Sequence, residues 1–203
     1  MENFSAAITF MRANPPTTGH FLIVDTLHNL PVDKKYIYLS HSQDKKKNPL
    51  PYFEKYSFIK TFVEEKYDDI EVVNSEARTL IDALYEVNSK GCNNITIVLG
   101  SDRIEEFSAL VYKYNGQVSK KTGEIIYQFD NINFVQAGED RNENSSDELS
   151  SISATKQRTL AAEGNFEEFS KGVPTNDPYL KKELYNILRE YMGIETKAIE
   201  VEK

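Results

Sequence analysis

Two short stretches of the sequence contain residues suited to binding phosphate. Residues 12–20 (RANPPTTGH) include Thr17 and His20, and residues 152–158 (ISATKQR) end in Arg158. Each stretch is predicted to open a helix, the first after an apolar strand-like run and the second after a polar loop. Helix starts carry unpaired backbone N–H groups and the positive end of the helix dipole, and both attract phosphate. Two such starts in one small domain predict a polyphosphate ligand.

The side chains of the two stretches suit two different phosphates. His20 lies three residues after Thr17, so both can point from the first helical turn into one pocket and donate to phosphate oxygens. Gly19 lets a ligand approach the backbone closely. The second stretch offers a helix cap and a planar cation for another phosphate. The residues for these roles are Ser153 or Thr155 as the cap and Arg158 as the cation.

The chain that must position these stretches alternates strand and helix patterns. Apolar β-prone runs predict strands at residues 6–11, 35–39, 70–73, 95–99 and 132–137. Helical spacing of apolar residues separates them, and the almost unbroken 95–99 run is typical of a central parallel strand. The order predicts an α/β fold with a five-stranded parallel sheet that has helices on both faces.

The second half of the chain departs from this alternation. Turn signals around two weak strand-like pieces predict an inserted hairpin-like excursion at about 115–131. Residues 138–151 contain one large apolar residue and five acids, so we expect a mobile loop. We expect residues 1–163 to form the main domain. We expect 164–203 to supply C-terminal helices and a charged tail packed on it.

Polar clusters follow four of the predicted strands. They lie at residues 12–20, 40–47, 100–103 and 138–158. Ligands of an open parallel sheet bind beyond the carboxyl ends of its strands, so these clusters should share one edge and one site. Within the second cluster, Lys46 and Lys47 would supply positive charge from a loop.

Composition excludes several classes of function. The net charge of −8 over 203 residues argues against nucleic acid or an anionic membrane as a partner, although a local cationic pocket is compatible with it. The single cysteine, Cys92, fits a reducing compartment. No apolar run approaches the ~20 residues of a membrane span, and the first residues do not resemble a signal peptide. We therefore expect a cytoplasmic protein.

The reactive side chains do not form a recognisable covalent or metal centre. No Ser or Cys lies in a pattern with a base and an orienting acid, and no His/Cys metal spacing is present. Walker and G-x-G-x-x-G loops are absent as well. The reactive side chains that are present favour charge stabilisation of phosphoryl groups over covalent catalysis, and we expect no protein-bound metal.

Four segments resemble the nucleotidyltransferase superfamily. Thr17-Thr-Gly-His20 resembles its (H/T)-x-G-H signature in the Thr-first form, and residues 152–158 resemble its I-S-S/A-T-x-x-R signature. Residues 47–50 (KNPL) resemble its K-x-P-L segment, and residues 100–102 (GSD) resemble the turn after its central strand. The wider pattern looks most like the cytidylyltransferase-like and nicotinamide-nucleotide adenylyltransferase-like proteins of large tailed phages. That origin would imply the host cytoplasm.

The resemblance implies a Rossmann-like, doubly wound fold and a shared reaction. A phosphorylated acceptor attacks the α-phosphorus of a nucleoside triphosphate and releases pyrophosphate, with Mg²⁺ carried by the nucleotide. By motif correspondence, His20 and Thr17 act at the reacting phosphate and Lys47 belongs to the same catalytic set. The residues implied for the nucleotide are Gly19, Asn14, Gly100, Asp102 and, at the leaving phosphates, Ser153, Thr155 and Arg158. Those expected on the acceptor side, from position alone, are Arg12 and His41.

Alternatives remain open at this stage. Thr17 as the first motif residue favours ATP, and thus an adenylyltransferase acting on an acceptor such as nicotinamide mononucleotide, over a cytidylyltransferase that activates a phosphorylated alcohol or sugar. Lys55 stands where relatives often carry Arg, which keeps the charge but weakens a bidentate contact. A non-catalytic nucleotide-binding or phage structural protein on the same fold is the alternative of another class. The sequence does not determine the acceptor or the oligomeric state.

Overall fold

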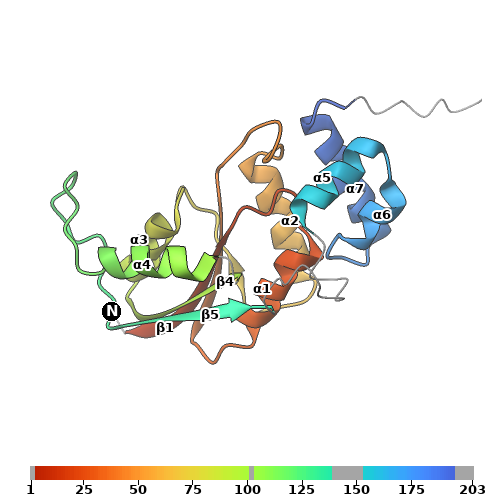
Figure 1. Ribbon diagram of the computed structural model, residues 1–203. Helices are drawn as coiled ribbons and strands as arrows, with labels where there is room; N and C mark the ends of the chain where they lie inside the picture. Colours follow the sequence, from red (N-terminus) through yellow and green to blue (C-terminus); the bar gives the residue numbers. More distant parts are fainter. Residues whose placement is uncertain (1–2, 101–102, 139–152, 195–203) are drawn as a thin grey trace, which may run out of the picture.

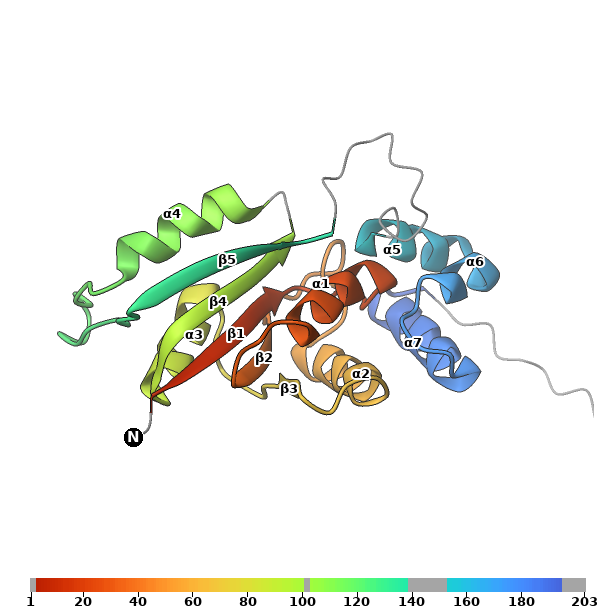
Figure 2. The ribbon, with the colours of Figure 1, turned by 90° about the horizontal axis from the view of Figure 1, so that it is seen from below.

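The computed structural model describes residues 3–100, 103–138 and 153–194, and within them the five predicted strands form one parallel sheet. The strand order is β3-β2-β1-β4-β5: the chain adds β2 and β3 on one side of β1 and then β4 and β5 on the other. This order confirms the predicted Rossmann-like, doubly wound fold. All four strand pairs are parallel (Figures 1 and 2). The strands are β1 (Phe4–Met11), β2 (Lys34–Leu39), β3 (Glu71–Val72), β4 (Cys92–Gly100) and β5 (Asn131–Ala137).

Helices cover both faces of this sheet. Those packed on one face are α1 (Thr18–His28) and α2 (Tyr52–Glu64), joined by the C-terminal helices α5 (Ala154–Glu163), α6 (Phe166–Lys171) and α7 (Pro178–Tyr191). Those on the other face are α3 (Leu80–Ser89) and α4 (Ile104–Tyr114). Figure 2 shows the strand arrows pointing towards α5 and α7, so these helices lie near the carboxyl edge of the sheet.

Strand side chains divide between the two helical layers by simple alternation. Ile8 in β1 and Ile97 in β4 join the core beneath α3 and α4. Ala7 and Val98, one residue away in each strand, join the core beneath α1 and α2. All four are fully buried, so β1 and β4 form the centre of the molecule, as the uninterrupted apolar run predicted.

The bounds of all five strands differ from the prediction, and for β3 and β4 the structure gives a local cause. β3 is two residues long because it is an edge strand that pairs only with Tyr36 and Ile37 of β2. β4 begins earlier, at Cys92, because polar side chains at its start are satisfied across the sheet. Asn93 Nδ2 donates to Asp130 Oδ2 over 2.9 Å, and Asn94 Oδ1 accepts from Asn131 Nδ2 over 2.6 Å.

The excursion between α4 and β5 is hairpin-like, as predicted. Val118 and Ile125 form an antiparallel bridge, and the backbone N–H of Gly116 donates to the carbonyl of Tyr127 over 2.8 Å. Tyr127 anchors the excursion in the core, where its buried hydroxyl donates to the carbonyl of Val111 over 2.7 Å. The predicted mobile loop lies outside the described residues beyond Gly138. None of the helices in the described ranges is long and apolar enough to span a membrane.

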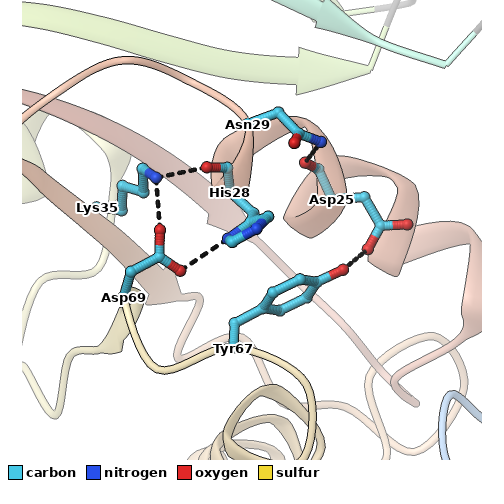
Figure 3. Close-up of polar contacts among 6 residues, drawn as sticks. All are labelled: Asp25, His28, Asn29, Lys35, Tyr67 and Asp69. Atoms are coloured by element: carbon cyan, nitrogen blue, oxygen red, sulfur yellow. Dashed lines mark hydrogen bonds and ion pairs between the residues drawn. The ribbon is translucent and has the colours of Figure 1, made fainter.

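A polar cluster joins three elements at the amino edge of the sheet (Figure 3). Asp69 contacts His28 Nδ1 at 2.8 Å and Lys35 Nζ at 2.5 Å, and the His28 ring packs on Tyr67 with ring centroids 4.5 Å apart. Tyr67 in turn donates to Asp25. His28 therefore has a structural role at the end of α1, away from the phosphate-binding stretches. Partial burial opposes ionisation of Asp69, but the hydrogen bonds from Lys35 and His28 outweigh it and lower its pKa.

We expect Asp69→Asn to lower the free energy of unfolding at pH 7 by less than about 1 kcal/mol, because the pair is partly exposed and screened. A lowered carboxyl pKa stabilises the fold above its unfolded value near ~3.9 and loses that effect as pH falls through the folded pKa. The difference in unfolding free energy between the wild-type protein and Asp69→Asn should therefore become smaller in acid. Urea unfolding at pH 7 and pH 3.5 measures it, with Asp68→Asn as the exposed control. A deficit that grows in acid would contradict the assignment.

Candidate functional site

A cavity of about 750 Å³ lies at the carboxyl edge of the sheet. Its wall includes the ends of β1 and β4 and the first residues of α1 and α5, so both predicted phosphate-binding stretches reach it. This is the position at which ligands bind in open parallel sheets. The predicted site residues on its wall are Arg12, Asn14, Thr17, Gly19, His20, Lys47, Gly100, Ser153, Thr155 and Arg158.

The charge of the wall contrasts with that of the whole chain. The chain carries a net charge of −8, yet the described residues of the wall include Lys and Arg side chains and no carboxylate. Cations gathered in a cleft raise the local potential and attract anions. The cations on the wall are Arg12, Lys46, Lys47, Arg103 and Arg158.

Thr17 and His20 form a capping box at the start of α1. The backbone N–H of His20 donates to Thr17 Oγ1 over 3.3 Å, and the backbone N–H of Thr17 donates to His20 Nδ1 over 3.2 Å. Because Nδ1 accepts a hydrogen bond, the proton of the neutral ring is assigned to Nε2. The cap thus fixes the ring and makes Nε2 a hydrogen-bond donor. Both residues lie on the cavity wall, and the capping contact between them is one that the sequence analysis did not predict.

Asn14 connects the first stretch to the chain ahead of α2. Its side chain donates to the carbonyl of Leu50 and accepts from the backbone N–H of Leu50, both over 2.9 Å. Asn14 is only 2% exposed, so these bonds form in a dry environment. The amide therefore positions the loop rather than presenting its side chain to a ligand.

Arg158 joins the two stretches directly. Its Nη1 donates to the backbone carbonyl of Asn14 over 2.7 Å, and its Nη2 donates to Thr155 Oγ1 over 3.0 Å. Burial lowers the pKa of Arg158 and nearby Asp44 opposes that shift, and an arginine stays charged under such a shift. Residues 144 positions apart in the sequence thereby meet at one guanidinium group.

The start of α5 is capped by Ser153. Its Oγ accepts from the backbone N–H of Lys156 over 3.1 Å, while Thr155 holds Arg158 instead. The sequence left the cap open between Ser153 and Thr155, and the structure assigns it to Ser153. Both residues line the cavity, so the positive end of α5 faces it.

Asp44 folds the lysine-rich loop against the cavity. Its carboxylate accepts from the backbone N–H groups of Lys47 over 2.7 Å and Lys46 over 2.9 Å, and from Asn48 Nδ2 over 2.7 Å. These bonds, that of Lys47 foremost, lower the pKa of Asp44 to about 2. Sequence reasoning missed Asp44. A signal was present in the sequence: an Asp that precedes a polar loop often accepts hydrogen bonds from backbone N–H groups two or three residues later, in an Asx turn.

Lys55 is fully buried near Arg12 of the cavity wall. Its ammonium group donates to the carbonyl of Ser40. Burial, reinforced by the positive charge of Arg12, lowers the pKa of Lys55 to about 8. This lysine therefore has no carboxylate partner among the described residues, and it lies close to a second cation, Arg12, on the wall.

One predicted site residue does not join this group, and another lies outside the described residues. His41 is absent from the wall: its ring stacks on Tyr52 with centroids 3.9 Å apart, and its Nε2 lies 2.8 Å from the carbonyl of Ser75. It holds the loops after β2 and β3 together. Asp102 lies outside the described residues. Arg103 lines the cavity although the sequence assigned it no role beyond its polar cluster, since a lone Arg after a strand carries no specific signal.

The fold is similar to that of solved mononucleotide adenylyltransferases. No known protein family and no curated protein matches the sequence. Among solved structures, a nicotinate-nucleotide adenylyltransferase from Vibrio parahaemolyticus aligns with TM-score 0.56 at 16% identity, over 89% of this chain and 97% of its own. The nicotinic acid mononucleotide adenylyltransferase of Plasmodium falciparum, solved with NaAD, aligns with TM-score 0.64 at 13% identity, over 95% and 99%. At these identities the likeness concerns the fold.

A third structure has the same fold within a longer chain. The bifunctional NMN adenylyltransferase/ADP ribose pyrophosphatase of Francisella tularensis aligns with TM-score 0.58 at 18% identity. The alignment covers 95% of this chain and 51% of that chain. The present chain therefore corresponds to about half of the bifunctional protein.

We expect Asn14→Ala to lower the free energy of unfolding by roughly 2 to 4 kcal/mol, because the N–H and carbonyl of Leu50 would both lose their partner in a buried setting. Urea unfolding followed by circular dichroism measures the loss. Asn29→Ala is the matched control, since the Asn29 amide bonds one carbonyl at an exposed helix end. Equal losses in the two variants would show that the Asn14 amide does not hold the loop.

Lys55 should make stability rise with pH. Its folded pKa of about 8 lies below the unfolded value near ~10.4, so between these values the unfolded state binds more protons and raising the pH favours folding. Relative to Lys55→Met, the wild-type protein should gain up to about 3 kcal/mol between pH 7 and pH 10. Urea unfolding of both proteins across that range tests this, since tyrosine ionisation is common to both. Parallel stability curves would contradict it.

Proposed function

We propose that this protein is an adenylyltransferase that transfers AMP from ATP to a small phosphorylated acceptor, such as nicotinamide mononucleotide, and releases pyrophosphate. One observation carries the proposal. Two helix starts and five cations share one cavity whose described wall holds no carboxylate, and Arg158 ties the two starts together. A polyphosphate is the ligand class that such a wall suits best.

The proposed reaction needs no protein nucleophile. An oxygen of the acceptor phosphate attacks the α-phosphorus of ATP, the new P–O bond closes a phosphoanhydride, and the bond to the β-phosphate oxygen breaks. The attacking oxygen is already anionic, so no proton has to be removed from it. The task of the protein is to align the two phosphates and to neutralise charge at the α-phosphorus.

His20 and the start of α1 would act at the reacting phosphorus. The capping box directs the proton of His20 to Nε2, from which it can donate to a non-bridging oxygen of the α-phosphate. This bond would strengthen as charge grows on that oxygen in the transition state. Thr17 would hold the ring in place, and Gly19 would let the phosphate approach the first helical turn.

The start of α5 would bind the β- and γ-phosphates that leave. Ser153 and Thr155 lie at the positive end of that helix, and Arg158 adds a fixed charge. Mg²⁺ would neutralise phosphate charge when it arrives with ATP. The described wall offers hydroxyl groups but no carboxylate, which fits a metal ion held by the phosphate oxygens themselves. The base and ribose would then lie towards Gly100 and Asp102.

The acceptor phosphate would meet Arg12, Lys46 and Lys47. These cations extend from the end of β1 and from the loop that Asp44 folds against the cavity. Buried Lys55 adds positive charge behind Arg12, and Asn14 holds the loop between them. His41 would contribute indirectly, by fixing the adjoining loop through Ser75.

Pyrophosphate release tests the proposal. The purified protein with ATP, Mg²⁺ and nicotinamide or nicotinic acid mononucleotide should release pyrophosphate and form the dinucleotide, and His20→Ala should lower kcat by about 100-fold or more. His28→Ala is the matched control, because it changes the other histidine of α1, at the far end of the helix, and should leave kcat unchanged. A comparison of ATP with CTP decides the nucleotide.

Turnover with CTP and a phosphorylated alcohol or sugar would replace the adenylyltransferase by the cytidylyltransferase alternative. No pyrophosphate release with any nucleoside triphosphate across a wide acceptor panel would overturn the proposal. An unchanged rate in His20→Ala would remove His20 from the reaction.

A further inference from the structure

Lys55 is a fully buried lysine that stands behind the cavity and is not part of its wall. Its side chain comes from α2, and its ammonium group donates to the backbone carbonyl of Ser40. No carboxylate among the described residues forms an ion pair with it. A buried ammonium group is costly unless a negative charge accompanies it. The described part of the chain leaves this need for negative charge unmet.

Ser40 connects this lysine to the end of β1. Its backbone N–H donates to the carbonyl of Met11 over 2.9 Å, and Arg12 is the next residue. Ser40 is buried, and its Oγ accepts from the backbone N–H of Ser42 over 3.0 Å, so it also fixes the start of the lysine-rich loop. Through this one residue, Lys55 holds both the strand end that carries Arg12 and the loop that carries two further cations of the wall.

Arg12 is the charged neighbour that acts on Lys55 among the described residues. Burial lowers the pKa of Lys55 to about 8, and the positive charge of Arg12 contributes to the shift. Acids of the surrounding elements act elsewhere: Glu54 of α2 lies close to two acids of α7, and Asp44 of the loop acts on Arg158. Arg12 is exposed on the cavity wall, so an anion that binds there also comes close to Lys55.

We propose that Lys55 is a positioning residue for the phosphate that binds at Arg12, and that this phosphate binds together with a proton at alkaline pH. In the proposed function, on which this inference rests, the phosphate is that of the acceptor. A dianion at Arg12 would offset the repulsion between the two cations, so Lys55 would be protonated in the complex even where it is neutral in the free protein. Affinity should therefore be highest below pH 8 and fall as the pH rises.

Isothermal titration calorimetry with nicotinamide mononucleotide between pH 7.5 and 9.5 tests the inference. A phosphomonoester has its second pKa near ~6, so the probe remains a dianion throughout this range. The Kd of the wild-type protein should rise by about tenfold or more from pH 7.5 to pH 9.5, as a proton has to be taken up from an increasingly alkaline solution. Titrations in two buffers of different ionisation enthalpy should show the uptake of up to one proton per phosphate bound.

Lys55→Arg separates this role from ordinary packing. Arginine stays charged throughout this range, so its Kd should not rise with pH and no proton should be taken up. Lys55→Met should bind about tenfold more weakly at pH 7.5 and lose the pH dependence. Lys60→Met is the matched control, because Lys60 is a lysine of the same helix that pairs with Glu64 at the surface, and it should follow the wild type. Circular dichroism checks folding, and the proton uptake of the wild type is a test that needs no variant.

The outcomes separate this inference from the proposed function. A wild-type Kd that does not change with pH, or proton uptake that persists in Lys55→Met, would overturn the inference. Proton uptake with ATP but not with the mononucleotide would overturn the assignment of the phosphate at Arg12 to the acceptor. Proton-linked binding of the mononucleotide without any pyrophosphate release would instead overturn the proposed function and support the role of Lys55. Absence of binding at every pH would overturn both.

Discussion

The site depends on the pairing of the Asn14 side chain with the backbone of Leu50. This buried amide fixes the turn after β1, in which Ala13 adopts a left-handed φ of 43°, a conformation that costs a non-glycine residue of order 1 kcal/mol or more. With the turn fixed, the carbonyl of Asn14 can receive Arg158, and α1 can begin at the Thr17 cap. Without it, the two helix starts would have no defined relation. A catalytic arrangement that works by positioning needs such a rigid joint.

Electrostatic repulsion between the cations around the cavity is the counterpart of this rigidity. An acidic chain collects its cations around one cavity and buries Lys55 beside Arg12, where burial and like charge lower the pKa of the lysine. Such an arrangement opposes folding slightly and favours anion binding, because a phosphate relieves the repulsion. Asp44 shows how the chain positions cations at the cavity without placing a carboxylate among them. Its carboxylate binds the backbone of the lysine loop, so it positions Lys46 and Lys47 while it stays off the cavity wall.

The two ends of the sheet carry different groups of polar residues. At the amino edge, Asp69 joins His28 and Lys35 in a cluster that connects α1, β2 and the segment before β3. At the carboxyl edge, the same helix α1 presents Thr17 and His20 to the cavity. One helix thus carries a histidine of a structural cluster at its end and, at its start, the histidine that we propose acts on phosphate.

Local patterns in the sequence were sufficient for the sheet and the helix starts, because periodicity and capping act within a few residues. They also brought most of the site residues to one edge, since the carboxyl ends of parallel strands must coincide. Tertiary structure alone decided that Arg158 reaches Asn14, that Lys55 is buried and that His41 stacks on Tyr52 away from the wall. These contacts join residues that lie far apart in the chain or depend on which side chains exclude water. Neither distant contacts nor the exclusion of water can be deduced from a few neighbouring residues, so only the packed chain determines them.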